Sequence, residues 1–148
     1  MNSSIHASAV LAGPKAVLIR GASGCGKSRL AWELIEAAAQ GALPFARLVA
    51  DDRAYIEAHH GRLLVRPAPV LAGLLEIRGL GIRHLPYEPV AVVGLVVDLA
   101  APDAARLPEP AALTVTLAGI TLPRLPVLPG HAALPAVLAF LKSLPAAN

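Results

Sequence analysis

Residues 16–28 read Ala16-Val17-Leu18-Ile19-Arg20-Gly21-Ala22-Ser23-Gly24-Cys25-Gly26-Lys27-Ser28. The four apolar residues at the start of this stretch favour a buried strand that stops at Gly21. Residues 28–40 (SRLAWELIEAAAQ) are rich in helix formers, and Gly41 supplies a stop signal after them. The chain is therefore expected to run from a strand through a glycine-rich loop directly into a helix.

The last eight residues of the stretch match the pattern G-x-x-x-x-G-K-[ST]. Glycines let the backbone curl until successive N–H groups point into one concavity, which can hold phosphate oxygens at the start of a helix. In such a loop Lys27 reaches the β- and γ-phosphates, and Ser28 can bind Mg²⁺. The alternative is a glycine turn with an incidental Lys-Ser pair, but the flanking strand and helix favour a phosphate-binding loop. The residues expected to bind the nucleotide are Gly21, Ala22, Ser23, Gly24, Cys25, Gly26, Lys27 and Ser28.

The rest of the chain predicts more strands than helices. Strands are expected at residues 47–50, 54–58, 63–66, 74–77, 90–99, 113–117 and 119–122, and a last helix at 132–144. One early helix followed mainly by strands is not a regular alternation of strand and helix. We therefore expect an α/β fold with a mixed sheet, formed as a single domain over residues 1–148.

The composition fits a globular domain and excludes several classes of protein. Hydrophobic residues make up 55 % of the chain and charged residues 16 %, which argues against disorder. A net charge of +3, without a run of Lys or Arg, gives no support for nucleic-acid binding. Cys25 is the only cysteine, so no intrachain disulfide can form. No apolar run is long enough to span a membrane, and we expect a soluble cytoplasmic protein.

Two carboxylates follow the strand expected at residues 47–50. Asp51 and Asp52 close this strand, and ligands of α/β proteins bind beyond the carboxyl ends of strands. One aspartate could hold a metal ion while the other accepts a proton from a hydroxyl nucleophile. The alternative is that the pair only forms a turn or caps a helix.

Glu76 stands between Leu75 and Ile77, where an unpaired buried carboxylate would be costly. Its side chain should therefore reach solvent or meet a cation. An ion pair with Arg78 is one interpretation, because the two residues would share a face if the strand continued. A Mg²⁺ ligand beside a phosphate-binding arginine is the other, and the residues alone leave both open.

The order of these motifs resembles the HPr kinase/phosphorylase family. His6 precedes the glycine-rich loop, which is followed by Val49-Ala50-Asp51-Asp52 and by Leu75-Glu76-Ile77-Arg78-Gly79-Leu80-Gly81-Ile82. The last stretch is similar to the signature of that family and is more specific than the loop. The resemblance extends over nearly the whole chain and corresponds to a short form that consists of the catalytic domain alone.

This resemblance implies a Mg²⁺- and ATP-dependent kinase that phosphorylates a serine of the phosphocarrier protein HPr, a component of the phosphotransferase system. It also implies a phosphate-loop fold similar to phosphoenolpyruvate carboxykinase and a homo-oligomer, often a hexamer. Carried over by position, Ser28 and Glu76 would bind Mg²⁺ and Asp52 would accept the proton. The remaining catalytic candidates are Asp51, Lys27, His6, Arg78 and Arg106.

One segment departs from the family pattern. Residues 126–131 resemble a motif linked to phosphorolysis, yet Leu128 and His131 stand where arginines are expected. The kinase direction is therefore better supported than phosphorylase activity, unless another residue such as Arg124 replaces them. A small-molecule kinase is a rival, but no arginine-rich lid is evident. An ATP-binding sensor without transfer activity is a second rival, and retention of both aspartates argues against it.

Overall fold

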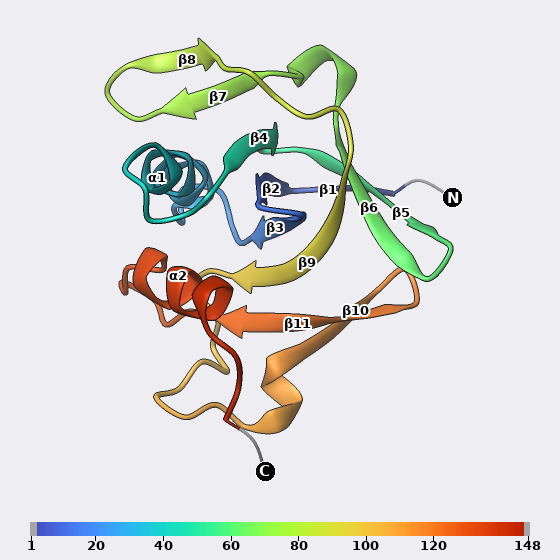
Figure 1. Ribbon diagram of the computed structural model, residues 1–148, viewed down its shortest axis with the longest axis vertical. Helices are drawn as coiled ribbons and strands as arrows, with labels where there is room; N and C mark the ends of the chain where they lie inside the picture. The colour runs from blue at the N-terminus through green and yellow to red at the C-terminus, as the bar shows by residue number, and fades with distance from the viewer. Residues whose placement is uncertain (1–2, 147–148) are drawn as a thin grey trace.

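The computed structural model describes residues 3–146, so residues 1–2 and 147–148 of the expected single domain lie outside the described part. Figure 1 shows the order of the helices and strands along the chain. They are β1 (Ser3–Ile5), β2 (Ala7–Ala12), β3 (Lys15–Arg20), α1 (Lys27–Ala39), β4 (Ala46–Ala50), β5 (Ala54–His59), β6 (Arg62–Pro67), β7 (Leu74–Ile77), β8 (Gly81–His84), β9 (Ala91–Asp98), β10 (Thr114–Leu117), β11 (Ile120–Pro126) and α2 (Leu134–Lys142), with short 3₁₀ turns at Pro69–Leu71 and Pro110–Leu113.

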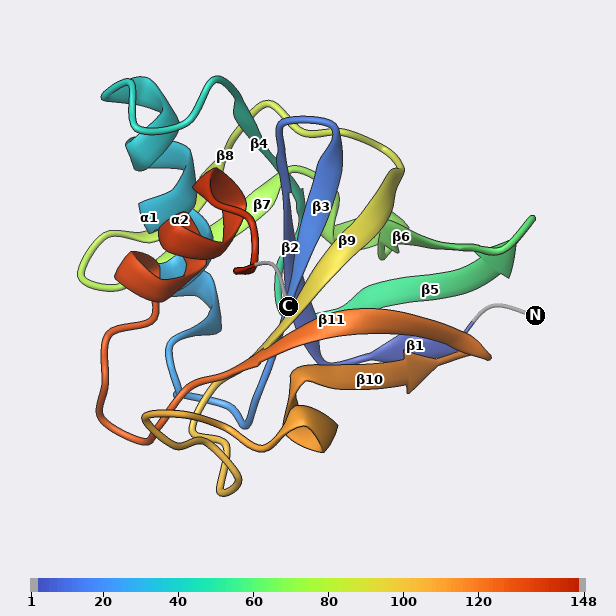
Figure 2. The ribbon, with the colours of Figure 1, turned by 60° about the horizontal axis from the view of Figure 1, so that its bottom comes forward.

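The predicted mixed sheet is confirmed. Nine strands form one curled sheet in the order β1-β5-β6-β9-β3-β2-β4, and β11 joins it beside β9 with β10 at its outer edge. Strands β3, β9 and β11 run parallel, whereas the other pairings in this sheet are antiparallel. Strands β7 and β8 form a separate hairpin that packs beside α1 and lies above it in the view of Figure 1; Figure 2 shows the same elements in a turned view.

Strand β3 is buried on both faces of the sheet, which explains why it is apolar from Ala16 to Ile19. Val17 and Ile19 pack into a core that includes α1 and α2, whereas Ala16 and Leu18 pack into a second core beneath strands β5 and β6. All four side chains are at most 1 % exposed. Side chains alternate between the faces of a strand, so both faces demand apolar residues and no polar alternation is left.

Helix α1 covers one face of the sheet through its apolar stripe, as predicted. Leu30 and Leu34 are buried against this face, and each contributes about 1.5–3 kcal/mol by leaving water. The helix begins directly after Gly26, which has a φ of 106°, and Gly41 lies in a left-handed conformation just beyond its end. The packing of this stripe fixes where the first turn of the helix points.

Strands β1, β2 and β8 are not evident from the sequence. Strand β2 reads ASAVLA, and alanine and serine have little strand preference, so pairing with β3 and β4 decides its conformation. Strand β11 also runs further than expected and includes Pro123 and Pro126. Both prolines lie at the ends of their ladders, opposite Thr114 and Asp98, where a missing N–H is tolerated.

A network of alternating charges ties together the carboxyl ends of the three parallel strands. Arg20 donates to Asp98 from Nε and Nη2 at 2.7 and 2.8 Å, and Arg124 Nε donates to the same carboxylate at 2.5 Å. Arg124 also donates to both oxygens of Asp103 and to the carbonyl of Ala112. The side chains of Asp98 and Arg124 are only 14 % and 12 % exposed. The network therefore holds the strand ends in fixed register.

Burial by itself would raise the pKa of Asp98, but hydrogen bonds and charges from Arg20 and Arg124 outweigh it and hold the pKa below its ordinary value. A carboxylate with a lowered pKa stabilises the fold at pH values above its unfolded pKa, which is about 4. This contribution is lost as the pH falls through the lower, folded value. The network is therefore expected to weaken only in acid.

Replacing Asp98 by Asn should lower the free energy of unfolding by about 2 kcal/mol at pH 7. Removing one partner of a fully buried ion pair costs about 3–5 kcal/mol. The expected cost is smaller here because the Arg20 side chain is 29 % exposed. The Asp103→Asn control, at a half-exposed carboxylate, should cost much less, because exposed ion pairs contribute little to stability. Urea unfolding at pH 7 and pH 3 measures both, and Asp98→Asn should also lose less stability in acid than wild type. Equal losses for the two variants would contradict the assigned role.

Candidate active site

The glycine-rich loop has the curled backbone that its sequence predicts. Gly21 has a φ of 151°, and a side chain there would come within 2.4 Å of Cys25 Sγ and 3.3 Å of Leu99 Cβ. Gly26 has a φ of 106°, in the region that side chains rarely adopt. These glycines let the loop turn tightly from the end of β3 into the first turn of α1.

Lys27 is the buried cation of the loop. Its side chain is 7 % exposed, and Nζ donates to the carbonyls of Gly21 at 2.9 Å and Ala22 at 3.1 Å. An ammonium group has three donors, so these two contacts leave one for an incoming anion. The ammonium is thereby fixed on the loop before any ligand arrives.

Asp51 is the central acceptor of the site. Its Oδ1 accepts hydrogen bonds from Ser8 Oγ and Ser28 Oγ, each at 2.7 Å, and its Oδ2 accepts from the backbone N–H of Glu76 at 3.1 Å. The residue is 7 % exposed, and Ser8 is fully buried. A single carboxylate thus joins β2, α1, β4 and β7. The role of Ser8 was missed from sequence, although it is the one polar residue in the apolar run of β2.

Asp52 has a different environment from its neighbour. It is exposed and has a φ of 68°, and its backbone N–H donates to Ser8 Oγ at 3.3 Å. The left-handed conformation turns the chain so that Asp51 is buried while Asp52 reaches the cavity above the loop. The geometry therefore separates the two aspartates that the sequence left open: one carboxylate is buried and accepts three hydrogen bonds, and the other is accessible.

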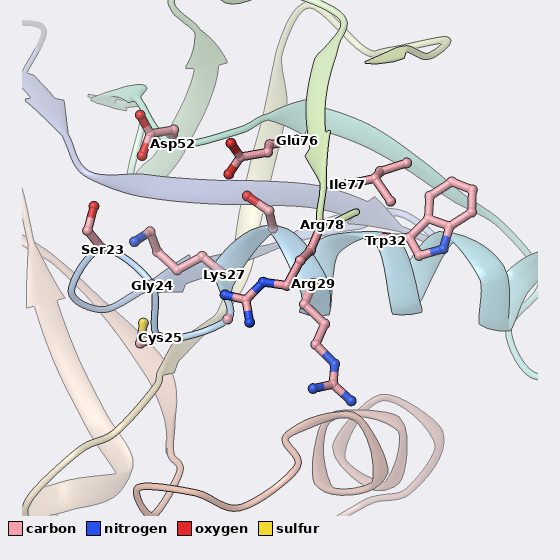
Figure 3. Close-up of a pocket in the computed structure, with 12 residues that line it drawn as sticks. Ser23, Gly24, Cys25, Lys27, Arg29, Trp32, Asp52, Glu76, Ile77 and Arg78 are labelled. Atoms are coloured by element: carbon pink, nitrogen blue, oxygen red, sulfur yellow. The ribbon is translucent and has the colours of Figure 1, made fainter. Parts of the chain in front are cut away.

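A cavity of about 530 Å³ gathers most of the predicted site residues (Figure 3). Its floor is the loop from Ser23 to Ser28, and its walls include Asp52, Glu76 and Arg78. Sequence reasoning did not single out the other residues of the wall, which are Arg29, Trp32 and Ile77. Figure 3 shows the side chains of Lys27, Asp52 and Glu76 turned toward the same space.

The β7–β8 hairpin positions Glu76 and Arg78. Strand β7 ends at Ile77, so Arg78 lies in the turn and does not continue the strand face of Glu76. Among residues 3–146, no ion pair joins these two side chains, and both line the cavity. The local ion pair is therefore not formed, and Glu76 is an exposed carboxylate at the cavity wall.

The predicted residues outside this cavity lining are His6, Gly21, Ala22, Asp51 and Arg106, of which only His6 and Arg106 lack a place in the loop or beside it described above. His6 is exposed between β1 and β2, directly before Ala7, which pairs with Arg20 at the same sheet edge where the loop begins. Arg106 is exposed in the long connection between β9 and β10. A catalytic role for either residue stays a prediction.

The oxygen groups around Ser28 fit a Mg²⁺ ion. The Asp51 carboxylate contacts the Ser28 hydroxyl, and the Glu76 carboxylate lines the same cavity. Within the described residues, no three His, Cys, Asp or Glu side chains gather into a metal-binding group. A sparse set of this kind suits Mg²⁺, which keeps several waters and binds one or two carboxylates together with substrate phosphates.

A family assignment follows from comparison with known sequences. The model of the HPr Serine kinase C-terminal domain matches residues 1–86, so this chain belongs to that family. The protein named HPr kinase/phosphorylase of Clostridium tetani is 44 % identical over 70 residues, which cover 47 % of this chain and 21 % of the relative. The protein of the same name from Streptococcus thermophilus is 49 % identical over 67 residues, 45 % of this chain and 19 % of the relative. The matches thus span about a fifth of the length of these relatives.

A solved structure is similar to this chain over almost its whole length, including the residues beyond the family match. The Hpr(Ser) kinase/phosphatase from Coxiella burnetii superimposes with a TM-score of 0.75, covering 95 % of this chain and 94 % of that chain at 24 % sequence identity. At this identity the match establishes the shared α/β fold with its curled mixed sheet.

Over the described residues, no helix has the length and apolarity needed to cross a membrane.

Replacing Ser8 by Ala should destabilise the fold by about 1–2 kcal/mol, because it removes a donor from the buried Asp51 carboxylate and the acceptor of the Asp52 N–H. The matched control is Ser4→Ala, since Ser4 Oγ only accepts an exposed hydrogen bond from Arg53. Urea denaturation compares the two, and the control should change by less than about 0.5 kcal/mol. A Ser8→Ala protein as stable as wild type would show that the hydroxyl does not hold the aspartates.

Proposed function

We propose that this chain is a Mg²⁺- and ATP-dependent kinase that phosphorylates a serine of an HPr-like phosphocarrier protein, with residues 1–148 acting as one catalytic domain. One observation carries the proposal: a single cavity brings the cationic phosphate-binding loop together with the accessible carboxylate of Asp52. Membership of the HPr Serine kinase family supports the same activity. We expect the protein to work in the cytoplasm and as a homo-oligomer, a hexamer by family resemblance.

The proposed transfer assigns each group a role. Asp52 takes the proton from the hydroxyl of the acceptor serine while the serine oxygen bonds to the γ-phosphorus. The bond between that phosphorus and the β,γ-bridging oxygen breaks, and ADP leaves. Lys27 and the N–H groups of the loop offset charge on the phosphoryl oxygens. Asp51, Ser28 and Glu76 would hold Mg²⁺, which when bound neutralises charge on the β- and γ-phosphates.

Two further side chains have proposed supporting roles. Arg78 reaches the same cavity and can hold a phosphate group through its guanidinium. Asp51 acts as a positioning residue as well as a metal ligand, because its contacts orient Ser28 and the backbone at Glu76.

The surroundings of the cavity favour a protein acceptor over a small metabolite. All four residues of β8 are exposed, including Ile82 at 65 %, and Leu80 just before the strand is 59 % exposed. Exposed apolar side chains next to a reactive site are typical of a surface that contacts another protein. The rival small-molecule kinase would instead need an enclosed acceptor pocket.

We propose that phosphorolysis is weak relative to the kinase direction. Leu128 and His131 cannot hold phosphate as the arginines of the resembled motif do. Arg124, the suggested substitute, is already bound by Asp98 and Asp103 and is 12 % exposed. Its side chain is therefore occupied within the fold.

The activity is tested by incubating the protein with γ-labelled ATP, Mg²⁺ and an HPr-like carrier, and by mapping the labelled residue with mass spectrometry. Label on a carrier serine supports the proposal. Label only on metabolites would identify a small-molecule kinase, and ATP binding without any transfer would identify a sensor.

Lys27→Ala should abolish transfer, with a rate loss on the order of 10³-fold, because the transferred group loses its closest fixed cation. The control is Lys142→Ala, a lysine near the end of α2 and away from the loop. Labelled transfer to the carrier measures both variants. Near-normal transfer by Lys27→Ala would refute the phosphate-loop assignment.

Asp52→Asn should keep ATP binding but lose transfer, since the amide retains the shape of the side chain and cannot accept the serine proton. Calorimetry measures the binding, and labelled transfer measures the rate. Asp51→Asn is the comparison, and it should weaken Mg²⁺-dependent ATP binding as well as transfer. The two roles would be reversed if the Asp52→Asn variant kept its transfer activity while the Asp51→Asn variant lost transfer and bound ATP normally.

A further inference from the structure

A second cavity of about 320 Å³ lies on the other side of the phosphate-binding loop. It shares Cys25, Gly26 and Arg29 with the first cavity, so the loop is the common wall of both. Its other walls come from distant parts of the sequence and include Leu99 and the segment Gly130–Ala133. The volume is at the lower end of the about 300–1,000 Å³ typical of small-molecule sites.

The topology of the sheet places this cavity beyond the carboxyl ends of the three parallel strands. Arg20, Asp98 and Pro126 are in register as the last residues of β3, β9 and β11. Gly21, Leu99 and the segment 127–133 follow these ends. In open α/β sheets, ligands bind in the crevice outside the carboxyl ends of parallel strands.

The walls of the second cavity are held by hydrogen bonds. Leu99 N–H donates to Arg20 O at 3.0 Å, and Val127 N–H donates to Asp98 O at 2.9 Å. Ala101 N–H in turn donates to Val127 O at 2.8 Å, which joins the segments after β9 and β11. The charge network around Asp98 fixes the strand ends directly beneath. The cavity is therefore preformed.

The two cavities differ in chemistry. The first presents Lys27, Asp52 and Glu76 to phosphates, metal and an incoming hydroxyl, and residues of the β7–β8 hairpin form part of its wall. The second combines apolar surface from Leu30, Leu99 and two alanines with the polar side chains of Arg29, Glu33 and the exposed His131. A flat base can pack against the apolar part of this wall and hydrogen-bond to its polar part, whereas a base placed in the first cavity would occupy the approach of the acceptor protein.

We propose that the second cavity binds the base and ribose of the nucleoside triphosphate, whose phosphates cross the loop at Cys25 and Gly26 into the first cavity. The proposal rests on the proposed function, because it extends the same nucleotide site. It gives residues 130–133 a role in binding the nucleotide in place of the phosphorolytic role suggested by the resembled motif.

The test compares ATP with inorganic tripolyphosphate, which carries the phosphates without the nucleoside, by calorimetry in the presence of Mg²⁺. Ala132→Trp fills the second cavity from an exposed position, and Ala136→Trp, on an exposed position of α2 outside the cavity, is the matched control. Ala132→Trp should weaken ATP binding about tenfold or more and leave tripolyphosphate binding within about twofold. His131→Ala, a milder change at the rim, should weaken ATP binding in the same selective way.

The outcomes separate this proposal from the proposed function. If wild type binds tripolyphosphate and Lys27→Ala does not, the phosphate site is supported independently of where the base binds. The base site alone would be overturned if the wild-type protein bound ATP no more tightly than tripolyphosphate. It would also be overturned if the Ala132→Trp variant kept the ATP affinity of the wild type. If Trp32→Ala lost the preference for ATP over tripolyphosphate while Ala132→Trp kept it, the base would lie in the first cavity. That result would also overturn the base site proposed for the second cavity. Failure of wild type to bind either probe would overturn both.

Discussion

The carboxylate of Asp51 is the constraint on which the candidate site depends. Burying a charge is unfavourable unless hydrogen bonds compensate, and this carboxylate receives three, from Ser8, Ser28 and the N–H of Glu76. These donors come from a strand, a helix and a hairpin that are distant in sequence. Satisfying one buried charge therefore fixes the first turn of α1, the end of β4 and the β7–β8 hairpin relative to one another.

The same arrangement explains how two adjacent aspartates can differ in function. Asp51 is held in place by three hydrogen bonds, while the left-handed backbone at Asp52 places the next carboxylate in the cavity. A group that must accept a proton needs access to the substrate, and a group that must hold a metal benefits from a fixed position. The Ser8 hydroxyl contacts both residues, through its bond to Asp51 and the N–H of Asp52, so it links the two proposed roles.

The second half of the chain contributes a separate framework. The family model covers residues 1–86, which contain the loop, both aspartates and the hairpin. Strands β9 and β11 lie beyond that match, yet β9 is the parallel neighbour of β3 and carries Asp98 into the charge network. The loop thus stands between two walls: one from the matched part, where we propose phosphoryl transfer, and one from the remainder, where we propose that the nucleoside binds.

The sequence by itself determined the strand, loop and helix around residues 16–40, because glycines and apolar periodicity act locally. It also indicated a mixed sheet and marked Asp51, Asp52 and Glu76 as candidates, since unpaired carboxylates beside apolar strands need a reason. Only the tertiary structure decided which aspartate is buried, that Ser8 and the Glu76 N–H bind it, and that Arg78 lies in a turn away from an ion pair. It also placed residues 130–133 against the loop. These facts depend on contacts between residues far apart in the chain, and no local pattern of residues encodes them.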